Sequence, residues 1–164
     1  KISCAVSSGH GPVTPMGVAT MTREALFAYG TLQFPDIIAA VTGRPLTGTR
    51  AVLEGYARFG IHNEPFPGIV PSEAHRIEGV VYTGVTPAER RRVDIFEGEP
   101  YHRETVTVLL REDGAWMEAI TYVIRPRWRT ILSAPGWDPD EFARRWHDTY
   151  VKRVTNARRA GELG

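Results

Sequence analysis

Glu97 is the residue of this sequence best placed for proton transfer. It lies in the segment 93-VDIFEGEPYHRETV-106, in the last turn of an expected helix that ends at Gly98. The negative end of a helix dipole disfavours an ionised carboxylate, and burial against apolar neighbours such as Phe96 would disfavour it further. Both effects raise the pKa of Glu97 toward neutrality, where one carboxyl group can accept and donate a proton. The alternative is an exposed glutamate at a helix end, with no chemical role.

A tight turn in 27-FAYGTLQFPDI-37 is the second candidate. A strand-like run ends at Tyr29, Gly30 and Thr31 turn the chain, and Pro35 opens an expected helix. A glycine turn before a helix can aim backbone N–H groups at one point, which is how proteins hold a small anion. Gly30 would be required there either for a positive φ or for the close approach of a substrate. The alternative is an ordinary connection between a strand and a helix.

Two polar residues follow Glu97 closely, and each has two interpretations. Tyr101 is either a polar contact in a pocket or an aromatic residue at the edge of a strand. Arg103 is expected to pair with a nearby carboxylate, and that pair could be structural or functional. These residues carry no signature strong enough to decide.

The signatures of several common catalytic sites are absent from the sequence. It contains no GxGxxG, Walker A, GxSxG or HExxH motif. The histidines are scattered without metal-ligand spacing, so we expect no metal and no cofactor. They are His10, His62, His75, His102 and His147.

The elements that must position these residues follow from hydrophobic alternation and from capping signals. Alternating runs predict strands, and Asp113-Gly114 predicts a two-residue hairpin between the last two. The predicted strands are 25–29, 51–59, 76–83, 103–111 and 116–124. Helices are predicted to begin at Pro35, Thr86-Pro87 and Asp138-Pro139. The sequence therefore predicts an α+β fold in which about three helices accompany a small, mixed and largely antiparallel β-barrel-like sheet.

The third predicted helix carries an apolar stripe. Phe142, Trp146 and Tyr150 recur at i, i+4 and i+8. Residues at this spacing share one helix face, so the stripe is expected to pack into the core.

Composition is that of a globular protein. Of the 164 residues 42% are hydrophobic and 24% are charged, and the net charge is +1. Residues 1–20, rich in Gly, Pro, Ser and Thr, are expected to be a disordered or artificially added leader, and 21–164 to form one domain. The single cysteine, Cys4, lies in that leader and suits a reducing cytoplasm. No apolar run is long enough to suggest a membrane span.

The chain ends in a basic segment that could instead suggest a nucleic-acid surface. Trp128 and Trp146 are interleaved with nine basic residues, as in some single-strand binding surfaces. The basic residues are Arg125, Arg127, Arg129, Arg144, Arg145, Lys152, Arg153, Arg158 and Arg159. Five acidic residues interrupt the run, and Trp146 is expected in the core, so we expect no nucleic-acid partner.

Four motifs in this order resemble the γ-glutamylcyclotransferase-like family, in its branch of avirulence-induced plant proteins and bacterial relatives. They are FAYGTL, 66-FPGIVPSE-73, 77-IEGVVYTGVTPAE-89 and VDIFEGEPYHRETV. The resemblance covers roughly residues 25–150 and implies a mixed domain around a small β-barrel-like sheet. It implies a substrate loop at Tyr29, Gly30, Thr31 and Leu32, a catalytic Glu97 and a pocket tyrosine at Tyr101.

The resemblance also implies a reaction. A γ-glutamyl amine or amino acid would be converted to 5-oxoproline and a free amine, because the α-amine of the substrate attacks its own side-chain carbonyl. No cofactor or protein nucleophile is then required, and the partner is a small γ-glutamyl molecule. The alternative is a non-catalytic binding module for a γ-glutamyl or other small acidic metabolite.

Overall fold

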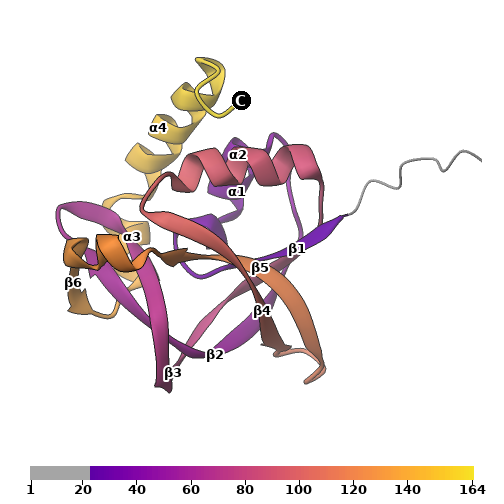
Figure 1. Ribbon diagram of the computed structural model, residues 1–164. Helices are drawn as coiled ribbons and strands as arrows, with labels where there is room; N and C mark the ends of the chain where they lie inside the picture. Colours follow the sequence, from indigo (N-terminus) through magenta and orange to yellow (C-terminus); the bar gives the residue numbers. More distant parts are fainter. Residues whose placement is uncertain (1–22) are drawn as a thin grey trace, which may run out of the picture.

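Five strands close into a barrel in the computed structural model, which describes residues 23–164 (Figure 1). The order around the barrel is β3-β1-β5-β4-β2, and a β2–β3 pairing closes it. A sixth strand, β6, pairs with the end of β2. The strands are β1 Glu24–Ala28, β2 Gly48–Ile61, β3 Glu64–Val85, β4 Tyr101–Leu110, β5 Trp116–Ile124 and β6 Leu132–Pro135. Only β1–β5 is parallel among the barrel pairings, so the predicted largely antiparallel barrel-like sheet is confirmed.

The helices lie on the outside of this barrel. They are α1 Pro35–Thr42, α2 Pro87–Glu97, α3 Pro139–Arg145 and α4 His147–Arg159, with short 3-10 turns at Thr31–Gln33 and Pro126–Ile131. Figure 1 shows α2 above the barrel and α4 rising beside it, with the C-terminus turned back toward α2. The three predicted helix starts are confirmed.

The sequence prediction was wrong about the helix after Asp138, the apolar stripe on it and the turn between β4 and β5. One helix was expected after Asp138, but the chain forms α3 and α4 with a break at Trp146, whose φ and ψ are −125° and −22°. The break disrupts the i, i+4, i+8 face, so Phe142 and Tyr150 are buried while Trp146 is 43% exposed. The β4–β5 hairpin forms, but residues 111–115 connect the strands rather than a two-residue turn.

The β3 strand is longer than predicted, because it begins at Glu64 rather than near residue 76. Three prolines in its first half, Pro65, Pro67 and Pro71, argue against a strand in the sequence, since proline cannot donate to a ladder. In the structure this half pairs with β2, and register shifts interrupt the ladder.

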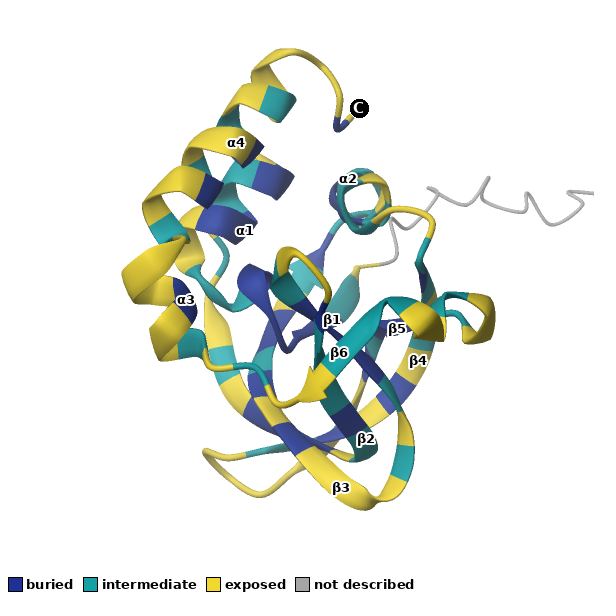
Figure 2. Cartoon of the chain, turned by 90° about the vertical axis from the view of Figure 1, so that its left-hand side faces the viewer, coloured by how far each residue is buried: buried dark blue, intermediate teal, exposed yellow. Residues whose placement is uncertain are grey.

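The core has two parts, because alternate residues of the strands face opposite sides of the sheet. One cluster, which includes Phe27, Leu53, Ile69 and Val108, fills the barrel. The other includes Leu26 and lies beneath the helices, where α4 is buried on its inner side and exposed on its outer side (Figure 2). The short strand β1 therefore contributes to both, and the chain leaves it directly into the predicted substrate loop.

Two sequence predictions lie outside the described residues. These are the expected leader at residues 1–20, with Cys4, and the histidine at position 10. Among residues 23–164, no helix combines the length and the apolar character needed to cross a membrane.

Candidate functional site

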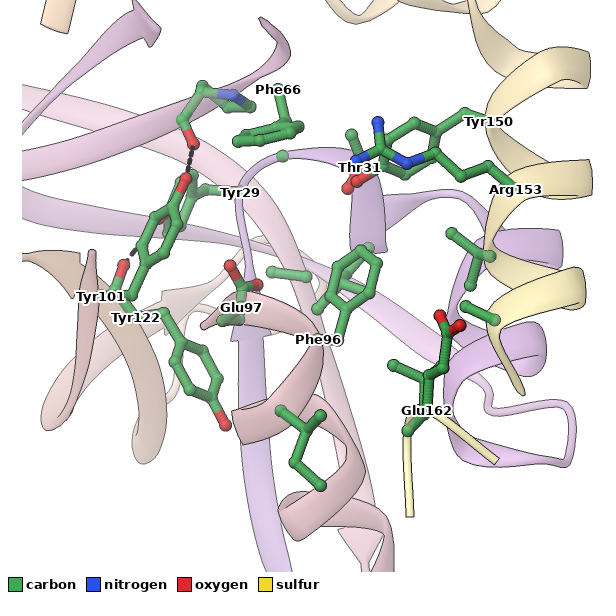
Figure 3. Close-up of a pocket in the computed structure, with 18 of the residues that line it drawn as sticks. Tyr29, Thr31, Phe66, Phe96, Glu97, Tyr101, Tyr122, Tyr150, Arg153 and Glu162 are labelled. Carbon is green, nitrogen blue, oxygen red and sulfur yellow. Dashed lines mark hydrogen bonds between the residues drawn. The ribbon is translucent and has the colours of Figure 1, made fainter. Parts of the chain in front are cut away.

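A cavity of about 660 Å³ lies between the outer end of β1, helix α2 and helix α4 (Figure 3). All six residues predicted for the site line it: Tyr29, Gly30, Thr31, Leu32, Glu97 and Tyr101. They come from three separate segments of the chain. The fold therefore brings together candidate residues that the sequence had indicated one segment at a time. The volume falls in the range of small-molecule sites.

Helix α2 carries Glu97 as its last residue, and both ends of the helix are fixed by specific contacts. At its start, the Thr86 hydroxyl accepts from the backbone N–H of Glu89, and the Glu89 carboxylate accepts from the Thr86 N–H, which is a complete capping box. Arg44 also pairs with Glu89 across the gap from α1. At its end, Gly98 has φ 77° and turns the chain away immediately after Glu97. Glu97 is thus the final residue of α2, as predicted.

The pKa of the Glu97 carboxyl is raised to about 8, and the cause is burial. The side chain retains partial exposure because it borders the cavity, but the surrounding protein removes most of its water. No hydrogen bond between residues 23–164 uses its carboxylate. Glu97 is therefore a proton-bearing group near neutral pH that can still reach a ligand.

The loop at 29–32 is fixed through its carbonyl oxygens. Arg58 donates to the Tyr29 carbonyl at 2.8 Å, Tyr82 donates to the Leu32 carbonyl at 2.7 Å, and the Gln33 N–H donates to the Gly30 carbonyl at 3.1 Å. The Tyr29 hydroxyl donates to the Tyr122 carbonyl at 2.6 Å, and burial raises the pKa of that hydroxyl well above its usual value.

The backbone N–H groups of residues 30–32 in this loop have no hydrogen-bond acceptor among the described residues. In the described part of the chain, no hydrogen bond has the backbone N–H of Gly30, Thr31 or Leu32 as its donor. All three residues are buried and border the cavity. Buried N–H groups are normally paired, so three unpaired ones at a cavity wall form a place for an anionic or carbonyl oxygen.

Gly30 is required by close packing and not by a positive φ. Its φ is −125°, so the first of the two sequence explanations was wrong. A Cβ at this position would lie 2.9 Å from both Cγ and Cδ of Pro67. The group that approaches Gly30 closely is therefore the Pro67 ring of β3.

The Tyr101 side chain lines the cavity. Its hydroxyl donates to the Pro67 carbonyl at 2.8 Å and the residue is 5% exposed. Gly30, Pro67 and Tyr101 therefore form one packed unit. Arg103 is directed elsewhere: it pairs with Asp94, which also accepts from the Tyr122 hydroxyl at 2.6 Å, so this pair supports the structure of α2 and the sheet.

Several cavity residues were not identified from the sequence. Tyr122 and Pro67 lie in segments read as strand or left unassigned, and Tyr150 was expected only as core. The outer wall comes from α4 and the turn after it, including Arg153, Glu162 and the 6%-exposed Leu163. The sequence gives little indication of these α4 residues, because basic residues with apolar residues at helical spacing are typical of any surface helix. Among residues 23–164, no three His, Cys, Asp or Glu side chains are grouped so that they could hold a metal ion.

Comparison with known proteins gives a consistent family. The family described as gamma-glutamyl cyclotransferase, AIG2-like, matches residues 26–144. AIG2-like protein C of Arabidopsis thaliana is 32% identical over 142 residues, which cover 84% of this chain and 81% of that protein. AIG2-like protein A is 36% identical over 129 residues, 79% and 72% of the two chains. The match to Protein AIG2 C, at 36% identity, spans only 59% of that relative's length.

Solved structures agree with this result. A solution structure of an Arabidopsis thaliana protein superposes with a TM-score of 0.64 at 28% identity, over 82% of this chain and 89% of that one. A gamma-glutamyl cyclotransferase with 15% identity has a TM-score of 0.57, over 81% and 86% of the two chains, and thus shares the fold. The chain belongs to the AIG2-like gamma-glutamyl cyclotransferase family.

Proposed function

We propose that this protein cyclises a γ-glutamyl amine or γ-glutamyl amino acid, releasing 5-oxoproline and the free amine. The observation that carries the proposal is the position of Glu97. A carboxyl group with a pKa of about 8 borders the same cavity as three buried, unpaired backbone N–H groups. These are the two components that an intramolecular acyl transfer needs from its enzyme.

The reaction balances without water or a protein nucleophile. The α-amine nitrogen of the substrate attacks its γ-carbonyl carbon, a ring C–N bond forms, and the bond to the leaving nitrogen breaks. Ionised Glu97 takes a proton from the attacking nitrogen and delivers it to the leaving nitrogen, so that Glu97 ends as it began. A pKa close to the working pH makes both transfers accessible to one group.

The 29–32 loop would stabilise negative charge during this exchange. An oxyanion forms on the γ-carbonyl oxygen, and the N–H groups of residues 30–32 are suitable donors for it or for the α-carboxylate of the substrate. Phe66, Phe96 and Tyr150 add aromatic surface to the cavity wall and limit the water around the reacting groups. Holding amine and carbonyl together can supply up to ~7–11 kcal/mol of the barrier reduction.

The test is turnover by wild type and Glu97→Gln on a panel of γ-glutamyl amines and amino acids, with 5-oxoproline as the readout. The glutamine keeps the size of the side chain but cannot exchange a proton. We expect kcat to fall by about 10²–10⁴-fold while substrate affinity, measured by calorimetry, changes little.

Glu99→Gln is the matched control, since Glu99 lies two residues further on, is exposed and pairs with Arg127. It should retain wild-type turnover. Equal turnover by Glu97→Gln and wild type would remove Glu97 from the mechanism. Ligand-induced thermal stabilisation without 5-oxoproline, for every compound of the panel, would instead identify a binding module.

A further inference from the structure

We propose that Arg153 on α4 makes the protein selective for γ-glutamyl substrates whose leaving amine carries a carboxylate. This inference rests on the proposed function, because it concerns the part of the substrate that is released. It names a specificity-determining residue outside the proposed proton-transfer groups.

The cavity has two chemically different sides (Figure 3). Glu97 reaches into it from the end of α2, beside Tyr29 and Tyr101. Arg153 and Glu162 reach into it from α4 and the turn that follows. Proton transfer at Glu97 places the scissile bond on the α2 side. With the α-carboxylate of the glutamyl part on the N–H groups of the 29–32 loop, the leaving group extends toward α4.

Arg153 is available to a ligand. In the part of the chain that the structure describes, no carboxylate lies within ion-pair distance of its guanidinium, although Glu162 borders the same cavity. Its guanidinium carbon lies 6.0 Å from the centre of the Tyr150 ring. This contact orients the planar donor group without neutralising its charge.

A guanidinium in this position favours a carboxylate partner. Arginine donates two parallel hydrogen bonds to a carboxylate, and such charge-assisted bonds are stronger than neutral ones. The α-carboxylate of the glutamyl part has donors of its own in the buried N–H groups of the 29–32 loop. Arg153 is exposed, so it meets the portion of the ligand nearest to solvent, through which the released amine must leave.

Arg153 lies outside the part of the chain that the family description matches. The family match ends at residue 144, whereas α4 spans 147–159. The α2 side of the cavity thus comes from the matched region and the outer wall from beyond it.

The experiment compares γ-glutamylalanine with γ-glutamylalaninamide, whose leaving groups are nearly the same size but carry a carboxylate and a neutral amide respectively. Wild type should prefer the acid by roughly tenfold in kcat/KM, mainly through KM, as expected for one charge-assisted contact at a partly exposed site. Arg153→Gln should bring the acid-to-amide ratio close to one. Lys152→Gln removes the same charge from the adjacent exposed position, which does not border the cavity, and should keep the wild-type ratio.

The outcomes separate the two proposals. A wild-type ratio near one, or an equal loss on both compounds in Arg153→Gln, overturns the role of Arg153 while cyclisation stands. The second result would mean that Arg153 holds the glutamyl carboxylate. If wild type turns over no compound of the γ-glutamyl panel, these two included, the proposed cyclisation fails, and the same ratio is measured as binding affinity by calorimetry. A loss of acid preference confined to Arg153→Gln then supports the selectivity, and equal affinities overturn it.

Discussion

At the residue scale, Glu97 lies in surroundings that disfavour the ionised form of its carboxyl group. Its pKa is about 8 in the folded protein, against an ordinary value of 4.5. Between these values the folded state holds a proton that the unfolded state has lost. The contribution of Glu97 to stability is therefore complete below about pH 4.5 and is lost as the pH rises through 8.

This direction of the pH dependence gives a prediction for Glu97→Gln, because glutamine has no ionisable group. As the pH rises from 5 to 8, the free energy of unfolding of the variant should increase relative to wild type, by at most about 1.4 kcal/mol per pH unit. Above pH 8 the difference should level off. Urea unfolding at a series of pH values measures it, with Glu99→Gln run in parallel as the exposed control. A pH-independent difference would contradict burial of the Glu97 carboxyl.

Gly30→Ala should damage the cavity through Pro67. The new Cβ would meet the proline ring at 2.9 Å, and the Pro67 carbonyl is the acceptor for Tyr101. We expect a loss of about 1–3 kcal/mol in unfolding free energy, typical of overpacking, and a larger proportional loss of ligand affinity.

Pro67→Ala offers the matched test, since it removes the two ring atoms that clash. In the Gly30→Ala background this second change should restore part of the lost stability, which a double-mutant cycle measures as coupling. Strictly additive effects would show that Gly30 is needed for another reason.

All six residues predicted from the sequence border one cavity, but the sequence did not give all of the reasons for their positions. A glutamate before a helix-ending glycine carries its own local signal, and Glu97 lies where that signal placed it. The contact that requires Gly30 comes from Pro67, 37 positions further along, which no local pattern shows.

At the element scale, α2 is stabilised at the end opposite Glu97. Thr86→Ala removes the acceptor for the Glu89 N–H and should reduce the unfolding free energy by about 1 kcal/mol. Turnover per folded molecule should remain at the wild-type level, because α2 is 11 residues long and Glu97 is at its far end. Denaturant titration and active-site-normalised rates check both parts.

Thr47→Ala is the control for this experiment, because Thr47 is exposed and lies outside the helices and strands. It should leave stability within about 0.5 kcal/mol of wild type. A loss of turnover in Thr86→Ala molecules that are folded would show that the cap also controls the position of Glu97.

The same scale explains which elements the sequence revealed. Caps and alternation are local, so the starts of α1, α2 and α3 and the strands β4 and β5 were recovered. The first half of β3 was missed because its prolines argue against a strand, and only the partner strand β2 makes the extended conformation favourable. The break at Trp146 was missed because apolar spacing continues through it.

At the scale of the whole molecule, the cavity lies between the barrel and helices α2 and α4 and depends on elements distant in sequence. Its walls extend from Phe27 near the start of the described chain to Leu163 near the end. A barrel-like sheet could be expected from five alternating segments, but the docking of α4 over the cavity could not. That contact is decided by packing between surfaces, and the sequence of α4 alone is compatible with many partners.

The placement of β1 has a consequence for the order in which the protein assembles. The β2–β3 and β4–β5 pairs join neighbouring segments, whereas β1 must fit between β3 and β5. The bond from the Tyr29 hydroxyl to the Tyr122 carbonyl spans 93 positions, and closing so long a loop costs entropy that later contacts must recover. Pulsed hydrogen exchange during refolding should protect both hairpins before residues 24–28, and the reverse order would refute this sequence of events. During synthesis, a nascent chain would then acquire the predicted substrate loop at residues 29–32 only after β5 has left the ribosome.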